Sequence, residues 1–410
     1  MKGGCNLPRR ASNAAIHKVS PDLPLTDEQA RLVQNIEQFV TTHINESQPA
    51  IFTVYGDAGT GKSVVLTHLF KRIQQAARID PTSPLKGTQN YFLVNHPEIL
   101  KVYREIAGNQ PHLLKKDFQR PTSLINQLEH GKTHADILVI DEAHLLLSQA
   151  DHYNNFYGTN QLQSLLSQAK VIILVFDETQ VLRFKSFWTE SRLERLLAPY
   201  PHVSYRLTHQ FRMHASDDLV QWINDFTHGH VHPLPDGGNH YDLRVFADAE
   251  QMRQQVVDRN RSVGLSRVVA TSGYPSTLDG GRHYINEGHF HLPWDQYNFT
   301  HTPWAELPET VNEVGSIYTC QGFDLNYVGV ILGPPISLSN TGQLAIHLDR
   351  YTDIEAFKKR PDLTDPTEIK RIKQQLILNS INVLMKRGVK GLYLFAHDAK
   401  LSHYLQTGHL

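Results

Sequence analysis

Residues 56–63 form a glycine-rich segment whose residue types and spacing suit the binding of phosphate groups. The segment matches the pattern G-x-x-x-x-G-K-S and reads Gly56, Asp57, Ala58, Gly59, Thr60, Gly61, Lys62, Ser63. In this pattern the glycines let backbone N–H groups converge on phosphate oxygens, the lysine reaches the β- and γ-phosphates, and the serine ligates Mg²⁺. An apolar run at 51–55 precedes the segment and a helical pattern at 64–73 follows it, as a nucleotide-binding loop requires. The alternative is a glycine-rich turn with a solvated lysine, which needs no such flanks.

Two adjacent carboxylates end another apolar run. Asp141 and Glu142 follow residues 137–140, and ligands of open α/β sheets bind at the carboxyl ends of the strands. Asp141 is placed to hold Mg²⁺ through water, whereas Glu142 can orient and deprotonate an attacking water. One acid would suffice for the metal, so the pair indicates hydrolysis. The alternative is that both acids cap the next helix.

Two further polar residues stand at the ends of elements, where they could reach a γ-phosphate. Gln180 follows the apolar run at 171–176, although Asp-Glu-Thr-Gln after a strand also begins many helices. Arg387 ends a helical pattern far along the chain. A guanidinium supplied across a domain cleft stabilises charge on a transferring phosphoryl group. The alternative for an isolated arginine is a surface salt bridge.

These residues follow apolar runs of strand length that alternate with helical segments. Strands are expected at 51–55, 91–94, 137–140 and 171–176 in a first series, and at 244–246, 267–271, 328–332 and 391–395 in a second. Continuous apolar strands separated by helices are typical of parallel sheets covered on both faces. The sequence therefore predicts an α/β fold with two successive units.

The predicted units divide at a His-, Pro- and Gly-rich stretch. A mobile N-terminal segment at 1–24 precedes a first domain at 25–227, and a linker or loop at 228–239 leads to a second domain at 240–410. Within the second domain, residues 272–313 are aromatic and polar without clean periodicity. We therefore expect a modest aromatic insertion there rather than a core element.

Length and composition exclude several classes of protein. The chain has 410 residues, of which 40% are hydrophobic, so it is neither disordered nor fibrous and exceeds one ordinary core. Forty Lys and Arg against 41 Asp and Glu give a net charge of -1, so no global basic field indicates nucleic acid. Cys5 and Cys320 are too few for a disulfide framework, which favours a cytoplasmic setting. Without a long apolar run, we expect no signal peptide and no membrane span.

The order of motifs resembles that of superfamily I helicases, and most closely the Schlafen-type (group 3) DNA/RNA helicase domain. The resemblance runs from residue 25 to about residue 398. Eight ordered segments carry it: 25–29 (LTDEQ), 56–63 (GDAGTGKS), 94–97 (VNHP), 141–144 (DEAH), 176–180 (FDETQ), 207–212 (LTHQFR), 318–324 (YTCQGFD) and 383–388 (VLMKRG). It implies two tandem RecA-like P-loop domains with parallel sheets and an ATP site in the interdomain cleft.

The resemblance also implies which residues surround the base and ribose. Gln29 would read the adenine edge, because its amide both donates and accepts. Thr26 and Gln29 form a capping-box pattern as well, and the two readings are compatible. Phe211 would stack on the adenine. Asp324 would hold the ribose, and Gly322 would let the backbone approach.

Some residues predicted to act on the γ-phosphate follow from the chemical arguments above, and others are implied by the resemblance. The predicted catalytic set is Glu142, Lys62, Gln180, Arg212 and Arg387. In this set Arg212 would contact the γ-phosphate and Gln180 would sense it. The predicted Mg²⁺ ligands are Ser63 and Asp141.

The sequence thus predicts a Mg-ATP-dependent ATP hydrolase, similar to helicases, that moves on or remodels single-stranded DNA or RNA. Trp188, Trp294 and Trp304 could offer stacking faces for unpaired bases, and Asn95 and His96 follow a strand at the position where superfamily I enzymes touch nucleic acid. The alternative is an ATP-gated switch or scaffold that acts with a protein partner, such as a separate nuclease, without motor activity.

Overall fold

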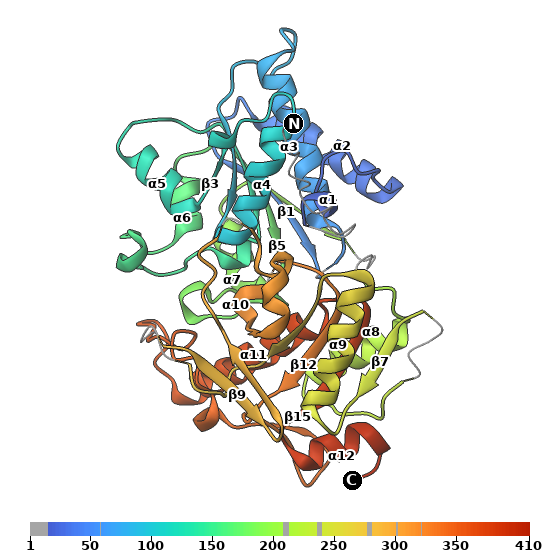
Figure 1. The fold of residues 1–410 in the computed structure, drawn as a ribbon. Helices are drawn as coiled ribbons and strands as arrows, with labels where there is room; N and C mark the ends of the chain where they lie inside the picture. The colour runs from blue at the N-terminus through green and yellow to red at the C-terminus, as the bar shows by residue number, and fades with distance from the viewer. Residues whose placement is uncertain are drawn as a thin grey trace, which may run out of the picture.

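Two sheets, one in each half of the chain, organise the molecule (Figure 1). The computed structural model describes residues 15–57, 59–207, 213–235, 240–276, 281–300, 302–320 and 322–410. The strands of the first sheet are β1 (Ala50–Gly56), β2 (Asn90–Val94), β3 (Phe118–Gln119), β4 (Ile137–Asp141), β5 (Val171–Phe176) and β6 (His202–Leu207). Their order is β3-β2-β4-β5-β1-β6, and every pairing is parallel. The predicted α/β fold with parallel sheets is therefore confirmed.

Helices cover both faces of the first sheet. The helices of this half are α1 (Ala15–Lys18), α2 (Asp27–His43), α3 (Lys62–Arg78), α4 (Pro97–Asn109), α5 (Pro121–Glu129), α6 (Gln161–Leu166) and α7 (Glu190–Leu197). Successive side chains of a strand point to opposite faces. In β1, Phe52 and Val54 pack into one core with α2, α3 and α4, whereas Ile51 and Tyr55 pack into another with α5, α6 and α7. The strand is buried on both sides, which explains its largely apolar sequence.

The second sheet has the order β7-β15-β12-β8-β11-β10-β9 and is parallel except for the β9–β10 hairpin. Its strands are β7 (Asp242–Val245), β8 (Ser266–Ala270), β9 (His283–Glu287), β10 (Phe290–Trp294), β11 (Val314–Gly315), β12 (Leu325–Leu332) and β15 (Gly388–Ala396), and β13 (Ile336–Leu338) and β14 (Leu344–Ile346) form a separate hairpin. Its helices are α8 (Asp217–Thr227), α9 (Ala249–Val263), α10 (Ile317–Cys320), α11 (Pro366–Met385) and α12 (Ala399–Thr407). The segment 272–313 supplies β9 and β10, which pair with the rest of the sheet through β11, and Phe290 and Trp294 lie in the core beside the sheet.

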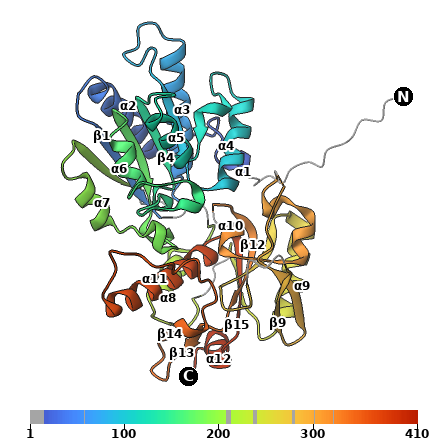
Figure 2. The same ribbon diagram turned by 90° about the vertical axis from the view of Figure 1, so that its left-hand side faces the viewer.

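Helix α11 packs into the cores of both halves. Ile372 and Leu376 join a core of the first sheet, and Ile377 and Ile381 join a core of the second sheet. In return Phe323, which precedes β12, packs into the other core of the first sheet. Figure 2 shows α11 at the junction of the two bodies. The two halves therefore meet through shared apolar packing.

The segments near the predicted domain limits also pack. Leu219 and Phe226 of α8 join the core of the second sheet, although the sequence assigns this helix to the first domain. Ile16 packs against a core of the first sheet, and Asp22 pairs with Lys71 of α3 at 2.8 Å. The domain limits stay a prediction. In the described part of the chain, no helix is both long and apolar enough to cross a membrane.

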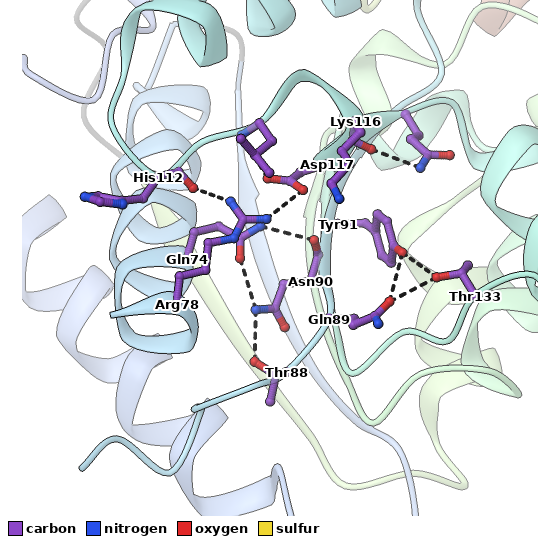
Figure 3. A network of polar contacts seen from close by, with 12 residues as sticks. Gln74, Arg78, Thr88, Gln89, Asn90, Tyr91, His112, Lys116, Asp117 and Thr133 are labelled. Carbon is purple, nitrogen blue, oxygen red and sulfur yellow. Dashed lines mark hydrogen bonds and ion pairs between the residues drawn. The ribbon is translucent and has the colours of Figure 1, made fainter. Parts of the chain in front are cut away.

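A polar network fixes the C-terminal half of α3 to the edge of the first sheet (Figure 3). Gln74 and Asn90 exchange hydrogen bonds of 3.3 Å between α3 and β2. Arg78 donates to Asp117 at 2.9 Å, and the same carboxylate accepts the backbone N–H of Leu114 at 3.0 Å. The helix that begins at the glycine-rich segment is thereby held to the sheet at its far end.

The buried carboxylate of Asp117 should stabilise the fold measurably. Asp117→Ala leaves the N–H of Leu114 and the guanidinium of Arg78 without this acceptor, and we expect a loss of about 1–3 kcal/mol in the free energy of unfolding. Urea unfolding followed by fluorescence measures the change, with exposed Glu129→Ala as the control. Equal midpoints for the two variants would contradict the prediction.

Candidate nucleotide-binding and hydrolysis site

The glycine-rich segment links β1 to α3 and wraps around the side chain of Lys62. Gly59 and Gly61 have φ angles of 90° and 78°, in the left-handed region that glycine adopts readily. The ammonium of Lys62 donates to the carbonyl oxygens of Gly56 at 2.5 Å and Asp57 at 2.6 Å. The loop therefore holds a cation at the N-terminal end of α3, where phosphate groups are favoured.

The remaining residues of the segment close the loop. The hydroxyl of Thr60 donates to the carbonyl of Asp57 at 3.0 Å. A Cβ on Gly56 would lie 2.8 Å from that hydroxyl oxygen and 3.2 Å from the carbonyl oxygen of Leu207, so a larger side chain would displace the loop. Ala58 lies outside the described residues.

The carboxylate of Asp141, at the end of β4, lies near the hydroxyl of Ser63, at the start of α3, which acts to lower the pKa of this carboxyl group. The hydroxyl of Tyr103 and the backbone N–H of Glu142 donate to the carboxylate, the N–H at 3.0 Å. Burial, and after it the negative charge of Glu142, raise the pKa of Asp141 to about 6. A cation would relieve this crowding of negative charge, and hydroxyl and carboxylate oxygens are ligands that Mg²⁺ accepts. The residues fit a Mg²⁺ site.

Glu142 occupies a strained backbone position directly after β4. Its φ and ψ are 52° and 48°, in the left-handed region that non-glycine residues seldom adopt and that clusters at functional sites. Its Oε2 lies 3.3 Å from Nε2 of His144, which is fully buried. Burial above all lowers the pKa of His144 to about 4, so the imidazole is neutral at pH 7 and can donate a hydrogen bond to the carboxylate.

A chain of polar contacts runs from Lys62 to Arg387 across the junction. The ammonium of Lys62 lies 3.8 Å from Oδ2 of Asp177, and the same oxygen accepts the amide N–H of Gln180 at 2.7 Å. The guanidinium of Arg387 donates to Oε1 of Gln180 at 3.3 Å and to the carbonyl of Phe323 at 3.1 Å. Arg387 is only 1% exposed, which excludes the surface salt bridge.

Asp177 keeps its charge in this chain of contacts. Burial acts to raise the pKa of its carboxyl group, but the charge of Lys62 and the hydrogen bonds from Thr179 and Gln180 outweigh it and lower the pKa. A buried carboxylate therefore stands between the lysine and the glutamine.

Gly322 and Asp324 make contacts that their predicted roles did not include. Gly322 has a φ of 85°, and a Cβ there would lie 2.3 Å from Cδ1 of Ile99 in α4. This glycine therefore allows a close approach between the two halves. Oδ2 of Asp324 lies 2.7 Å from Nζ of Lys18 in α1. Its predicted contact with the ribose stays a prediction.

The capping box at the start of α2 is formed. The N–H of Gln29 donates to the hydroxyl of Thr26 at 3.3 Å, and the N–H of Thr26 donates to Oε1 of Gln29 at 3.1 Å. The contact of Gln29 with adenine stays a prediction. Phe211 and Arg212 lie outside the described residues.

The suggested stacking role of the tryptophans is wrong. Trp188, Trp294 and Trp304 are 4%, 1% and 2% exposed, because each packs into a core or against a neighbouring element. His96 is also buried, where it caps α4 by accepting the N–H of Ile99 at 3.4 Å, and burial chiefly lowers its pKa to about 3.

Comparison with known proteins identifies the family. The model of the family described as "Schlafen group 3, DNA/RNA helicase domain" matches residues 49–398. The chain belongs to this family. It is also 37% identical to the "Uncharacterized protein YPL245W" of Saccharomyces cerevisiae (strain ATCC 204508 / S288c), over 97% of this chain and 95% of that protein. In family and fold this chain is a helicase-like P-loop ATPase.

Two solved structures of Pif1 helicases show a low overall similarity. The Pif1 helicase from Candida albicans is 12% identical, with 90% of this chain and 95% of that chain covered and a TM-score of 0.35. The Pif1 helicase from Bacteroides in complex with ADP-AlF3 and ssDNA is 11% identical, with coverages of 94% and 95% and a TM-score of 0.35.

Sequence reasoning missed three residues that shape the site. Asp177 had a signal, because it directly follows β5, at the same edge of the sheet where Asp141 ends β4. His144 belongs to the quoted DEAH segment, yet the sequence does not reveal its contact with Glu142. Tyr103 had no signal, because it lies within an ordinary amphipathic helix.

Proposed function

We propose that the chain binds Mg-ATP at the junction of its two halves and hydrolyses it to drive movement on, or remodelling of, single-stranded nucleic acid. The observation that carries this proposal is the chain of contacts from Lys62 through Asp177 and Gln180 to Arg387. Only three contacts separate Lys62 from Arg387, a buried arginine of the other half. A group that binds to Lys62 therefore perturbs Arg387.

The ammonium of Lys62 exchanges its loop carbonyls for oxygens of the β- and γ-phosphates. Bound Mg²⁺, held by Ser63 and Asp141, would neutralise charge on these oxygens. Glu142 accepts a proton from the attacking water, and the N–H of His144 orients the carboxylate. Gln180 and Arg387 contact the γ-phosphate, to which we assign Arg212 as well, so they register whether it is present.

Hydrolysis drives movement if it changes how the two halves pack. The guanidinium of Arg387 is shared between Gln180 of the first half and the carbonyl of Phe323 in the second. Its transfer to a phosphate oxygen would alter both contacts, and with them the position of the segment around Gly322 against α4. This rearrangement would couple the bound nucleotide to the bound single-stranded nucleic acid.

The P-loop assignment is tested by Lys62→Ala. Removal of the ammonium leaves the phosphate charge without its main side-chain partner, so we expect ATP turnover to fall roughly 100-fold or more. The matched control is Lys71→Ala, on the same helix but paired with exposed Asp22. Turnover is measured by phosphate release with and without single-stranded DNA or RNA. Unchanged turnover in Lys62→Ala would remove the assignment.

The alternative is an ATP-gated switch that acts with a protein partner. Wild-type protein that hydrolyses ATP at one rate, with or without strands, and binds no strand would favour it. A cytoplasmic location, a protein partner such as a separate nuclease, and the choice between DNA and RNA also stay predictions.

A further inference from the structure

We propose that Tyr297 and Phe299 form a platform on which unpaired bases of a single strand stack, with the guanidinium of Arg120 beside it as a phosphate contact. This inference deepens the proposed function and rests on it. It names residues outside the eight motif segments, on the loop that follows β10.

Both rings face solvent. Tyr297 is 75% exposed and Phe299 is 87% exposed, in contrast to the buried tryptophans of the same half. Their ring centroids lie 4.7 Å apart with the planes tilted by 40°. Two neighbouring aromatic faces in water are an apolar surface without a partner, and nucleic-acid bases stack on such faces with little sequence preference.

The loop that carries the rings is held in place by its own hydrogen bonds. Oδ1 of Asn298 accepts the N–H of Thr300 at 3.0 Å, and its Nδ2 donates to the carbonyl of Thr302 at 2.8 Å. Asn298 therefore fixes the chain between and just after the two aromatic residues. A fixed loop presents the rings with little loss of conformational entropy on binding.

The loop also spans the junction of the two halves. Asn298 donates to Oε2 of Glu98 at 3.2 Å, and Lys101 donates to the carbonyl of Thr300 at 2.6 Å. Both partners lie on α4, which meets the second half close to α10 in Figure 1. Gly322 contacts the same helix through Ile99. Movement of one half against the other would therefore change the contacts of a nucleic-acid strand bound on the platform.

The guanidinium of Arg120 provides the positive charge. It donates to Oδ1 of Asn95 at 3.3 Å, and among the described residues its buried Nε has no hydrogen-bond acceptor. The guanidinium lies near the loop, because its partner Asn95 stands three positions before Glu98, which accepts the amide N–H of Asn298. The residue as a whole is half-buried, so the terminal nitrogens of the guanidinium, rather than the buried Nε, would donate to a phosphate oxygen.

The acidic groups nearby are already paired with lysines. Asp151 lies 2.9 Å from Lys185, and Glu98 lies 2.6 Å from Lys101. Among the residues that the structure describes, no carboxylate therefore pairs with Arg120. Exposed aromatic faces next to such a guanidinium favour a strand of bases and phosphates over an apolar protein surface.

The test measures the affinity for a fluorescent oligothymidylate and a matching oligouridylate of about 20 nucleotides by anisotropy. Tyr297→Ala and Phe299→Ala should each weaken binding roughly 5- to 100-fold, the range for one lost base–aromatic stack. Tyr297→Phe keeps the ring and should bind as wild type does. Ile79→Ala is the control, because Ile79 is also exposed, at 52%, but follows the far end of α3. Thermal melting verifies that each variant is folded.

Salt dependence tests the role of Arg120 separately. Arg120→Gln should reduce the slope of log affinity against log salt by about 0.7, as expected for one phosphate contact on a single strand. If Tyr297→Ala and Phe299→Ala both bind the oligonucleotides with wild-type affinity, the platform is wrong. If single strands still stimulate the ATPase in that case, the proposed function stands and the two rings are assigned to a protein contact. If wild type binds no strand, both the platform and the motor are wrong.

Discussion

Glu142→Gln is expected to bind ATP with wild-type affinity and to hydrolyse it about 100- to 10,000-fold more slowly, the range for a lost general base. The amide keeps the size and shape of the side chain but cannot accept a proton from water. Because Ser63, Asp141 and Lys62 remain in place, the contacts that bind the phosphates are retained. The expected signature is a loss of turnover without a loss of binding.

Single-turnover hydrolysis and a separate titration with a fluorescent ATP analogue measure the two quantities. Exposed Glu129→Gln is the matched control, since it makes the same chemical change away from the site. If Glu142→Gln loses nucleotide affinity instead, the carboxylate supports the strained backbone at 142 and does not serve as the base. His144→Phe offers an independent check, because it removes the imidazole nitrogen that contacts Glu142 at 3.3 Å and should lower turnover less than Glu142→Gln does.

Local sequence patterns predicted the elements that carry the phosphate site. The run at 51–55 is β1 (Ala50–Gly56), the run at 171–176 is β5, and Asp141 ends β4. These features are short-range, because a strand buried on both faces must be apolar and a phosphate loop must contain glycine at fixed positions. Neighbouring parallel strands then bring their carboxyl ends to one edge, which places the side chains of the loop, Asp141 and Asp177 together.

The sequence did not predict contacts between segments that lie far apart along the chain. Whether an aromatic residue is buried depends on which element covers it, so the buried Trp304 and the exposed Phe299, five positions apart, could not be told apart by type. The pairing of Asp324 with Lys18 joins residues 306 positions apart. The two cores shared by α11 likewise follow from tertiary packing, because its sequence shows one continuous helical pattern.

Arg387→Ala is expected to keep most of the affinity for ATP but to lose about 1,000-fold or more in hydrolysis, the lower end for an arginine that stabilises a transferring phosphoryl group. Its guanidinium is buried and joins Gln180 of the first half to the carbonyl of Phe323 in the second. Arg387→Lys keeps the charge but not the planar fork, so it should restore little of the lost activity. Circular dichroism and thermal melting separate this effect from misfolding.

The same variant tests whether nucleotide and strand are coupled. Linkage requires that each ligand changes the affinity of the other by the same factor. In the wild type, strand affinity should differ several-fold between a non-hydrolysable ATP analogue and ADP, because only the analogue draws Arg387 away from Gln180. In Arg387→Ala that difference should vanish, since the residue that registers the γ-phosphate from the second half is gone. A wild-type protein that binds strands equally in every nucleotide state has no such linkage, and its ATPase then acts as a switch toward a protein partner.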